Sequence, residues 1–166
     1  MPRGKPLPAR GRRSEDYLKT IYMLKERKGV IRVKDIAEEL GVRAPSVVNF
    51  LEELASEGLI IYEKRERIDL TDKGLKIARE VRERHEAIKN FLKLLLNIGD
   101  EEAEADACYI EHGVGDETLE RIRMFIRFTR ECPFNTLPVF LKHLYYYYRT
   151  GSRPPECSEC PHKTLS

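Results

Sequence analysis

Apolar residues in the first half of the chain recur at the three- and four-residue spacing of helices that bury one face. Tyr17, Ile21 and Leu24 predict a first helix with Ser14 as its N-cap, and Gly29 ends it. A turn at Gly41 separates two further amphipathic helices. The apolar positions of these helices are Val33, Ile36, Ala37 and Leu40, and then Val47, Phe50, Leu51 and Leu54.

The stretch LIIYEKRERIDLTDKG, residues 59–74, breaks this helical spacing. Its β-branched and aromatic residues predict two short strands around a charged tip at residues 63–67, and Thr71 or Asp72 caps the next helix. Two helices, a glycine turn, a third helix and a charged hairpin follow the order of a winged helix-turn-helix. This order favours DNA binding over a protein-interaction domain whose hairpin charges are merely solvated.

In the second half of the chain, the spacing of apolar residues predicts only helices. A long helix over residues 72–96 is followed by helices near residues 101–113, 115–128 and 137–149, the last one rich in tyrosine. We therefore expect a mainly α fold. Its predicted parts are a basic flexible arm (1–13), a winged helix domain (14–73), a helical domain (74–130) and an aromatic helix with a cysteine-containing tail (131–166).

Composition narrows the class of protein. The 166 residues are 41% hydrophobic and 35% charged, which indicates a globular chain with one core or two small ones. The first thirteen residues carry five lysine and arginine residues and no acid, so this arm either docks on phosphates or only aids solubility. No apolar run approaches a membrane span or a signal peptide, so we expect a cytoplasmic protein with reduced cysteines and no membrane partner.

The third predicted helix carries residues that suit DNA on the face opposite its apolar positions. Arg43 can bind guanine or phosphate, and Asn49 can pair with adenine. Glu52 and Glu53 would repel DNA, so only the first two helical turns are expected to enter a groove. Basic residues at the hairpin tip suit phosphate contacts. The expected DNA-binding residues are Arg43, Pro45, Ser46, Asn49, Lys64, Arg65 and Arg67.

The segment DACYIEHGV, residues 106–114, combines a thiol, a carboxylate and an imidazole. On a helix, Cys108, Glu111 and His112 share a face and can converge on one ion. These donors suit a borderline transition metal and not calcium or magnesium. The alternative is a charged helix that contains a cysteine. His85 lies on the apolar stripe of the long helix, where it is either a ligand or a core histidine bonded to a backbone carbonyl.

Several segments together resemble the diphtheria-toxin-repressor and manganese-transport-regulator family of metal-dependent repressors. They are SEDYLKTIYML, VKDIAEELGVRAPSVVNFLEEL, IIYEKRERIDLTDKG, RHEAIKNFL and DACYIEHGV, and the match runs from about Ser14 to Phe128. The resemblance implies a winged helix domain followed by a helical metal-binding and dimerisation domain. Because the sequence ends soon after this match, we expect no SH3-like C-terminal domain of the kind found in the iron branch. The resemblance also implies a homodimer that, when loaded with metal, binds palindromic operator DNA of metal-uptake genes.

The resemblance further implies a set of metal ligands. These are Asp16, His85, Cys108, Glu111 and His112, with Glu104 beside His85 in an ancillary site.

This ligand set is a hybrid of two branches of the family. The manganese branch usually has glutamate where this chain has Cys108 and a second acid where it has Lys19, whereas the iron repressors usually have methionine in place of Asp16. Lys19 cannot ligate while charged, and we expect it to pair with Asp16. The family's glutamate four residues after His85 is Lys89 here, which places the ancillary site in doubt. The thiolate favours Fe(II), with Mn(II) as the alternative.

The C-terminal tail predicts a possible second metal site that the family does not supply. Cys157 and Cys160 form a C-x2-C knuckle, and with Cys132 and His162 they can hold a structural Zn(II). His143 is a second candidate for the fourth ligand. Free thiols and a redox pair are the alternatives.

Two rival functions stay open. One is a metal-independent winged-helix regulator with a small-molecule pocket, and the other is a metalloenzyme. The sequence offers no general-base arrangement beside the ligands, so we expect no enzyme activity and no small-molecule substrate. The physiological metal, the operator and the state of the tail cysteines are not determined by the sequence.

Overall fold

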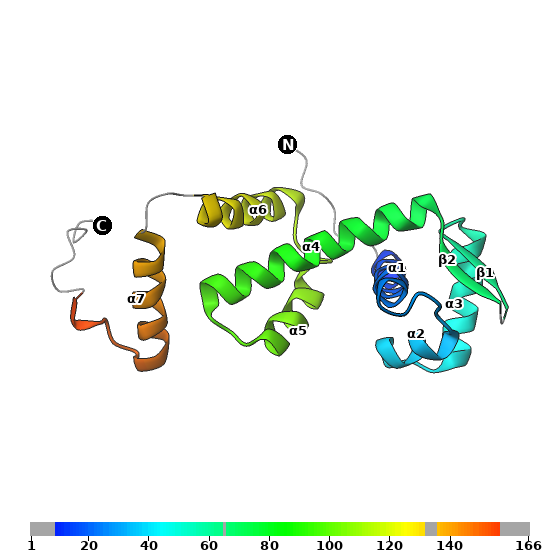
Figure 1. Ribbon diagram of the computed structural model, residues 1–166, viewed down its shortest axis with the longest axis horizontal. Coiled ribbons are helices and arrows are strands. Elements are labelled where there is room, and N and C mark those ends of the chain that lie inside the picture. The colour runs from blue at the N-terminus through cyan, green and yellow to red at the C-terminus, as the bar shows by residue number, and fades with distance from the viewer. Residues whose placement is uncertain (1–8, 65, 132–135, 157–166) are drawn as a thin grey trace.

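The computed structural model describes residues 9–64, 66–131 and 136–156 (Figure 1). Over these residues the fold is mainly helical, with one two-stranded sheet, as predicted. The elements in chain order are α1 (Ala9–Lys28), α2 (Val33–Leu40), α3 (Ala44–Ser56), β1 (Ile60–Glu63), β2 (Arg67–Leu70), α4 (Asp72–Leu96), α5 (Asp100–Ile110), α6 (Asp116–Glu131) and α7 (Thr136–Thr150).

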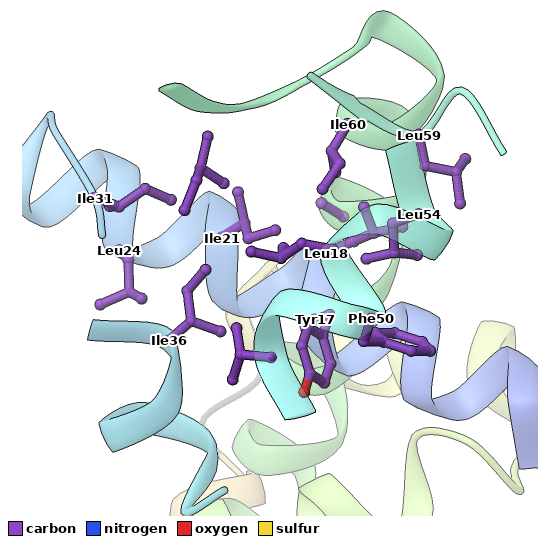
Figure 2. Packing of buried hydrophobic residues seen from close by; sticks show 14 residues of the cluster. Tyr17, Leu18, Ile21, Leu24, Ile31, Ile36, Phe50, Leu54, Leu59 and Ile60 are labelled. Carbon is purple, nitrogen blue, oxygen red and sulfur yellow. The ribbon is translucent and has the colours of Figure 1, made fainter. Parts of the chain in front are cut away.

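The first unit, from α1 to β2, is the predicted winged helix-turn-helix. Strands β1 and β2 are antiparallel, with Ile60 opposite Leu70 and Glu63 opposite Arg67. Aliphatic side chains from α1, α2, α3 and β1 interdigitate in one core (Figure 2). Complete burial of each such side chain stabilises the fold by about 1.5–3 kcal/mol. The largest fully buried aliphatic residues of this core are Leu18, Ile21, Leu24, Ile36, Val47, Leu51 and Leu54.

Helix α1 begins at Ala9, so the prediction that Ser14 caps it was wrong. Residues 9–13, predicted as part of the flexible arm, are helical. Alanine and arginine favour helix and no proline stands between Ala9 and Ser14, so the helix extends towards the N-terminus. The Arg13 guanidinium also lies 4.2 Å from the ring centroid of Phe50 and 5.6 Å from that of Tyr17, which anchors this first part of α1 on α3.

The start of α4 is fixed against the sheet. Thr71 is the N-cap and accepts a hydrogen bond from the Gly74 amide at 3.2 Å, while its own hydroxyl donates to the Gly58 carbonyl at 2.8 Å. A Cβ at Gly74 would lie 2.0 Å from the Leu59 carbonyl oxygen, so only glycine permits this approach. The long α4 thereby leaves the winged unit in one set direction.

The second unit consists of α4, α5 and α6, which pack around a smaller apolar cluster. Helix α4 runs from the winged unit past α5 and α6, and α1 crosses its first half (Figure 1). Two alanines on α5 face α4 and allow close approach. The buried residues of this cluster are Ile88, Leu92, Ala103, Ala107, Leu119 and Ile122.

Helix α7 stands at the far end of α4 (Figure 1). The Tyr145 hydroxyl donates to the Leu94 carbonyl, and the Tyr148 hydroxyl donates to the Leu95 carbonyl at 3.3 Å. These bonds satisfy carbonyl groups in the last turn of α4, which has no helical amide left to donate to them. Among the described residues, no helix combines the length and the apolar character needed to cross a bilayer.

Candidate metal centre and DNA-binding surface

The candidate metal centre lies where α1 meets α4 and the end of α5. Helix α1 turns two different faces to its neighbours, because its buried Leu18 and Ile21 point into the core of the winged unit. Glu15, Asp16 and Lys19 lie on the opposite side of the same helix turns and contact residues of the second unit. One helix therefore joins the winged unit to the cluster of polar side chains.

Glu111 is the centre of this cluster and is fully buried. Glu111 directly follows the last residue of α5, and its backbone angles are still helical. Cys108, Glu111 and His112 are therefore spaced as on a continuous helix. The Oε1 atom of Glu111 lies 2.6 Å from Lys19 Nζ and 3.3 Å from His112 Nε2, and its Oε2 atom lies 2.9 Å from His85 Nδ1. A buried carboxylate requires such partners, because burial without them strongly disfavours its charge.

His112 connects α1 to the end of α5 through both nitrogens of its ring. Nδ1 lies 2.9 Å from Glu15 Oε2, and Nε2 lies 2.9 Å from Asp16 Oδ1. The hydrogen bonds to Asp16 and then Glu15 raise the pKa of His112 to about 9. Glu15 is a partner that the sequence reasoning missed. Its signal was its place one helical turn before Lys19, on the same face of α1.

His85 is buried on α4 and faces Glu111. Burial opposes a charge on this imidazole, but hydrogen bonds with Cys108 and Glu111 raise its pKa to about 10. Its Nε2 atom lies 2.9 Å from Glu104 Oε1 but lacks the alignment of a hydrogen bond. Nε2 thus has no aligned bond with Glu104 and can serve as a metal ligand once the ring has lost its proton.

The predicted ligands form two overlapping groups. In one, ligand atoms of His85, Cys108 and Glu111 all lie within 4.8 Å of one another, and in the other those of Asp16, Glu111 and His112 do. The combination of imidazole, thiol and carboxylate donors fits a divalent transition metal. The structure brings all five predicted residues together, and their role as ligands remains a prediction.

Two lysines stand at positions where the family resemblance implies acidic residues. Lys19 does not pair with Asp16, contrary to the prediction, but lies 2.6 Å from Glu111 Oε1 and 3.6 Å from Cys108 Sγ. Asp16 is engaged by His112 instead, and the buried Glu111 offers the ammonium a stronger partner. Lys89 lies 2.8 Å from Glu104 Oε2, so a cation stands where the ancillary site would have a further carboxylate.

The expected DNA-reading residues are exposed at the start of α3. Arg43 is its N-cap residue with extended backbone, and Pro45 stands in the first turn. Pro45, Ser46 and Asn49 are all exposed. Their contact with DNA remains a prediction.

The hairpin between β1 and β2 carries its cations in ion pairs. Lys64 lies 2.7 Å from Glu52 of α3, and Arg67 lies 2.9 Å from Asp69. Both cations are exposed, and exposed ion pairs contribute little to stability, so DNA phosphates can compete for Lys64 and Arg67. Arg65 lies outside the described residues.

The predicted zinc knuckle of the tail cannot be placed. Cys132, Cys157, Cys160 and His162 lie outside the described residues. His143, the other candidate for the fourth ligand, is half-buried on α7.

These features together define a class of protein. A winged helix-turn-helix shares its first helix with a cluster of metal-ligating groups in a second, helical unit. This is the arrangement of a DNA-binding regulator that responds to a metal.

Comparison with known proteins identifies the family. Residues 11–68 match the N-terminal DNA-binding domain of iron-dependent repressors, and residues 71–136 match the metal-binding and dimerisation domain of the same repressors. The transcriptional regulator MntR of Bacillus pumilus is 38% identical over 117 residues, which cover 70% of this chain and 81% of that protein. The chain therefore belongs to the family of the diphtheria-toxin repressor and the manganese-transport regulator. It is a metal-dependent DNA-binding transcriptional repressor and not an enzyme.

Solved structures of manganese regulators have the same fold. The manganese regulator SloR is 37% identical with a TM-score of 0.62, over 69% of this chain and 54% of that one. A manganese-dependent transcriptional repressor in complex with manganese is 30% identical with a TM-score of 0.64, over 69% of this chain and 53% of that one. The chain thus spans about half the length of these structures.

Proposed function

We propose that the chain is a homodimeric repressor of metal-homeostasis genes that binds a palindromic operator when loaded with Fe(II), with Mn(II) as the second candidate. The observation that supports this function is the position of Glu111. Its buried carboxylate is shared by the two groups of candidate ligands, one of which includes Asp16 on α1 of the DNA-binding unit.

This position couples the two units through the chain's own residues. Asp16 belongs to α1, which also supplies the core of the winged unit, whereas Glu111 and His112 follow α5. A divalent ion held by Asp16, His85, Cys108, Glu111 and His112 would supply two positive charges to these donors. With Asp16 and His112 held together, α1 and the attached recognition helix keep one orientation relative to the second unit. Metal then favours the arrangement that fits DNA by a shift in population.

Each group of donors favours a different metal. Cys108 and His85 supply sulfur and nitrogen, which suit Fe(II) better than Mn(II). Asp16, Glu111 and His112 supply two carboxylates and one imidazole, a set that also suits Mn(II). The manganese regulators among the similar structures support this second candidate.

Exposed apolar side chains on the second unit support the homodimer. Tyr109 on α5 is 84% exposed, and Phe128 on α6 is 62% exposed. Aromatic residues are enriched at protein–protein interfaces relative to the rest of a protein surface. They lie in the segment that matches the family's dimerisation domain. A two-fold symmetric pair would present two recognition helices to two half-sites about one helical turn of DNA apart.

The test is a selection of duplex DNA from a random pool with the full chain, carried out in parallel with Fe(II) under anaerobic conditions and with Mn(II). We expect palindromic sites whose affinity falls at least about tenfold when the metal is removed with a chelator at fixed salt. The metal that supports binding at the lower free concentration is the activator.

Asp16→Asn is the informative variant, and Asp72→Asn, at the exposed start of α4, is its matched control. We expect Asp16→Asn to need a higher metal concentration for DNA binding and the control to behave as the wild type. Selected sites whose affinity is unchanged by chelation would instead support a metal-independent winged-helix regulator.

A further inference from the structure

We propose that Lys19 is an intramolecular competitor for the metal: its ammonium group holds Glu111 and must leave before a divalent ion can bind, which sets the metal concentration to which the regulator responds. This inference rests on the proposed metal centre and adds a determinant of its affinity. It concerns a residue that is not itself a ligand.

The first argument is the position of the ammonium group. Lys19 is only 8% exposed, and its Nζ atom lies 2.6 Å from Glu111 Oε1 and 3.6 Å from Cys108 Sγ. Cys108 and Glu111 belong to one candidate ligand group, and Glu111 also belongs to the other. The cation therefore stands against donor atoms that a bound metal would need.

The second argument is the limited capacity of Glu111. A carboxylate oxygen has two lone-pair sites, and Oε1 is already approached by Lys19 Nζ and, at 3.3 Å, by His112 Nε2. A divalent ion held by this carboxylate would lie close to the ammonium group that is already bonded to Oε1. Two positive charges so close together in a buried site repel each other strongly, so the ammonium and the metal exclude one another.

The third argument separates Lys19 from the two histidines of the cluster. His85 and His112 also bind the carboxylates through hydrogen bonds, but each becomes a ligand when it loses a proton. Lys19 has no such second role. Its Nζ atom lies 2.6 Å from the Glu111 carboxylate and 3.6 Å from the Cys108 sulfur, and these partners favour the charged form of the amine. It remains a cation and competes with every divalent metal.

The fourth argument is a route by which the side chain can withdraw. A cavity of about 530 Å³ adjoins Lys19 and is also lined by Asp16 and Cys108. The same cavity is lined by Glu39 and Leu40 at the end of α2, in the helix-turn-helix. The flexible stem of lysine can rotate into this space and place the ammonium away from Glu111.

The test compares metal binding by the full chain and by Lys19→Gln, which removes the charge but keeps a polar side chain of similar reach. Dissociation constants for Mn(II) and Co(II) are measured on chelator-treated protein by competition with a fluorescent chelator. We expect the variant to bind both metals at least about tenfold more tightly, because it has no repelling cation to displace. The ratio of the two affinities should stay within about threefold of the wild-type ratio.

Lys25→Gln is the matched control, since Lys25 is on the same helix and pairs with Asp69 away from the candidate ligands. We expect its metal affinity to equal that of the wild type. Metal affinity in Lys19→Gln that is unchanged or weaker would overturn the inference, and if this variant does not fold, Lys19→Met takes its place.

A structure of the wild-type chain with Co(II) tests the same point without a substitution. We expect Lys19 Nζ to lie beyond hydrogen-bond distance of Glu111, and an intact bond beside bound metal would overturn the inference. The outcomes also separate the two proposals. If the wild type binds metal and responds to it on DNA but Lys19→Gln binds equally well, only the inference fails. If the wild type binds no metal at these residues, both fail.

Discussion

The two sides of α1 form contrasting regions of the molecule. One side carries Leu18, Ile21 and Leu24 into an apolar core, where stability comes from buried apolar area and does not depend on ions (Figure 2). The other side carries Asp16 and Lys19 to a cluster of buried charges, where each group needs its partners. Helix α1 is therefore fixed firmly in the winged unit by apolar packing. Its attachment to the second unit depends instead on charged groups, and for that reason on the proposed metal.

The largest effect is expected from Glu111→Ala, because this change leaves Lys19 and His85 without their shared carboxylate. Removing one partner of a buried ion pair costs about 3–5 kcal/mol of stability. The free energy of unfolding in denaturant, measured on chelator-treated protein, gives this loss of stability. Glu86→Ala, at an exposed position on the same α4 that carries His85, is expected to change stability little. A loss below about 1 kcal/mol in Glu111→Ala would mean that water reaches the cluster and the contrast is weaker than the structure indicates.

A double variant sharpens this result. Glu111→Ala combined with Lys19→Met removes the stranded ammonium as well as the carboxylate. We expect it to recover part of the stability lost in Glu111→Ala, which measures the coupling of the pair in a double-mutant cycle. Simple addition of the two single effects would contradict the contact between them.

The next largest effect concerns the apolar side of α1. Leu18→Ala removes a fully buried side chain and should lower the free energy of unfolding by about 2–5 kcal/mol. Val30→Ala, at a position that is 77% exposed, is the control and should change stability by less than about 0.5 kcal/mol. Denaturant midpoints with and without metal measure both.

The same pair of measurements tests the separation of the two sides. The stabilisation that metal adds should be the same in Leu18→Ala as in the wild type, because no candidate ligand has changed. A lost metal response in Leu18→Ala would show that the core and the cluster are not independent.

The smallest effect is expected at Asp35, where the first unit contains a charged contact of its own. The ion pair with Lys28, at 2.5 Å, and the Arg32 amide, at 2.8 Å, lower the pKa of this carboxyl below its ordinary value of 3.8. A depressed carboxyl pKa contributes stability above the unfolded value, and this contribution is lost as the pH falls through the folded value. Asp35→Asn should therefore be less stable than the wild type at pH 7.

Unfolding followed from pH 7 to pH 3 checks this expectation. The difference between wild type and Asp35→Asn should narrow below pH 3.8. Lys28→Gln, which leaves the carboxyl in place, should show an intermediate acid dependence. A constant difference at all pH values would assign the effect to the lost helix cap and not to the charge of Asp35.

The sequence by itself determined the elements and the kinds of donor. Helices and the hairpin follow from apolar spacing and from glycine and threonine signals, which act between residues close together in the chain. Cys108, Glu111 and His112 are also close together in the chain, and the helical backbone at the end of α5 retains their spacing. For this reason the winged fold and most of the candidate ligands could be predicted from the amino-acid sequence alone.

Tertiary structure decided which charged groups meet. Helical spacing favours a pair between Lys19 and Asp16, its neighbour on α1, but Lys19 pairs with Glu111, which is 92 positions away. Local spacing likewise gives no reason to connect Glu15 with His112, although the two side chains are in contact. The choice among such partners depends on which carboxylate is most deeply buried when α1 packs on α4 and α5, and no local pattern encodes that burial. The sequence supplied the charges, and packing determined that a lysine stands where the metal is proposed to bind.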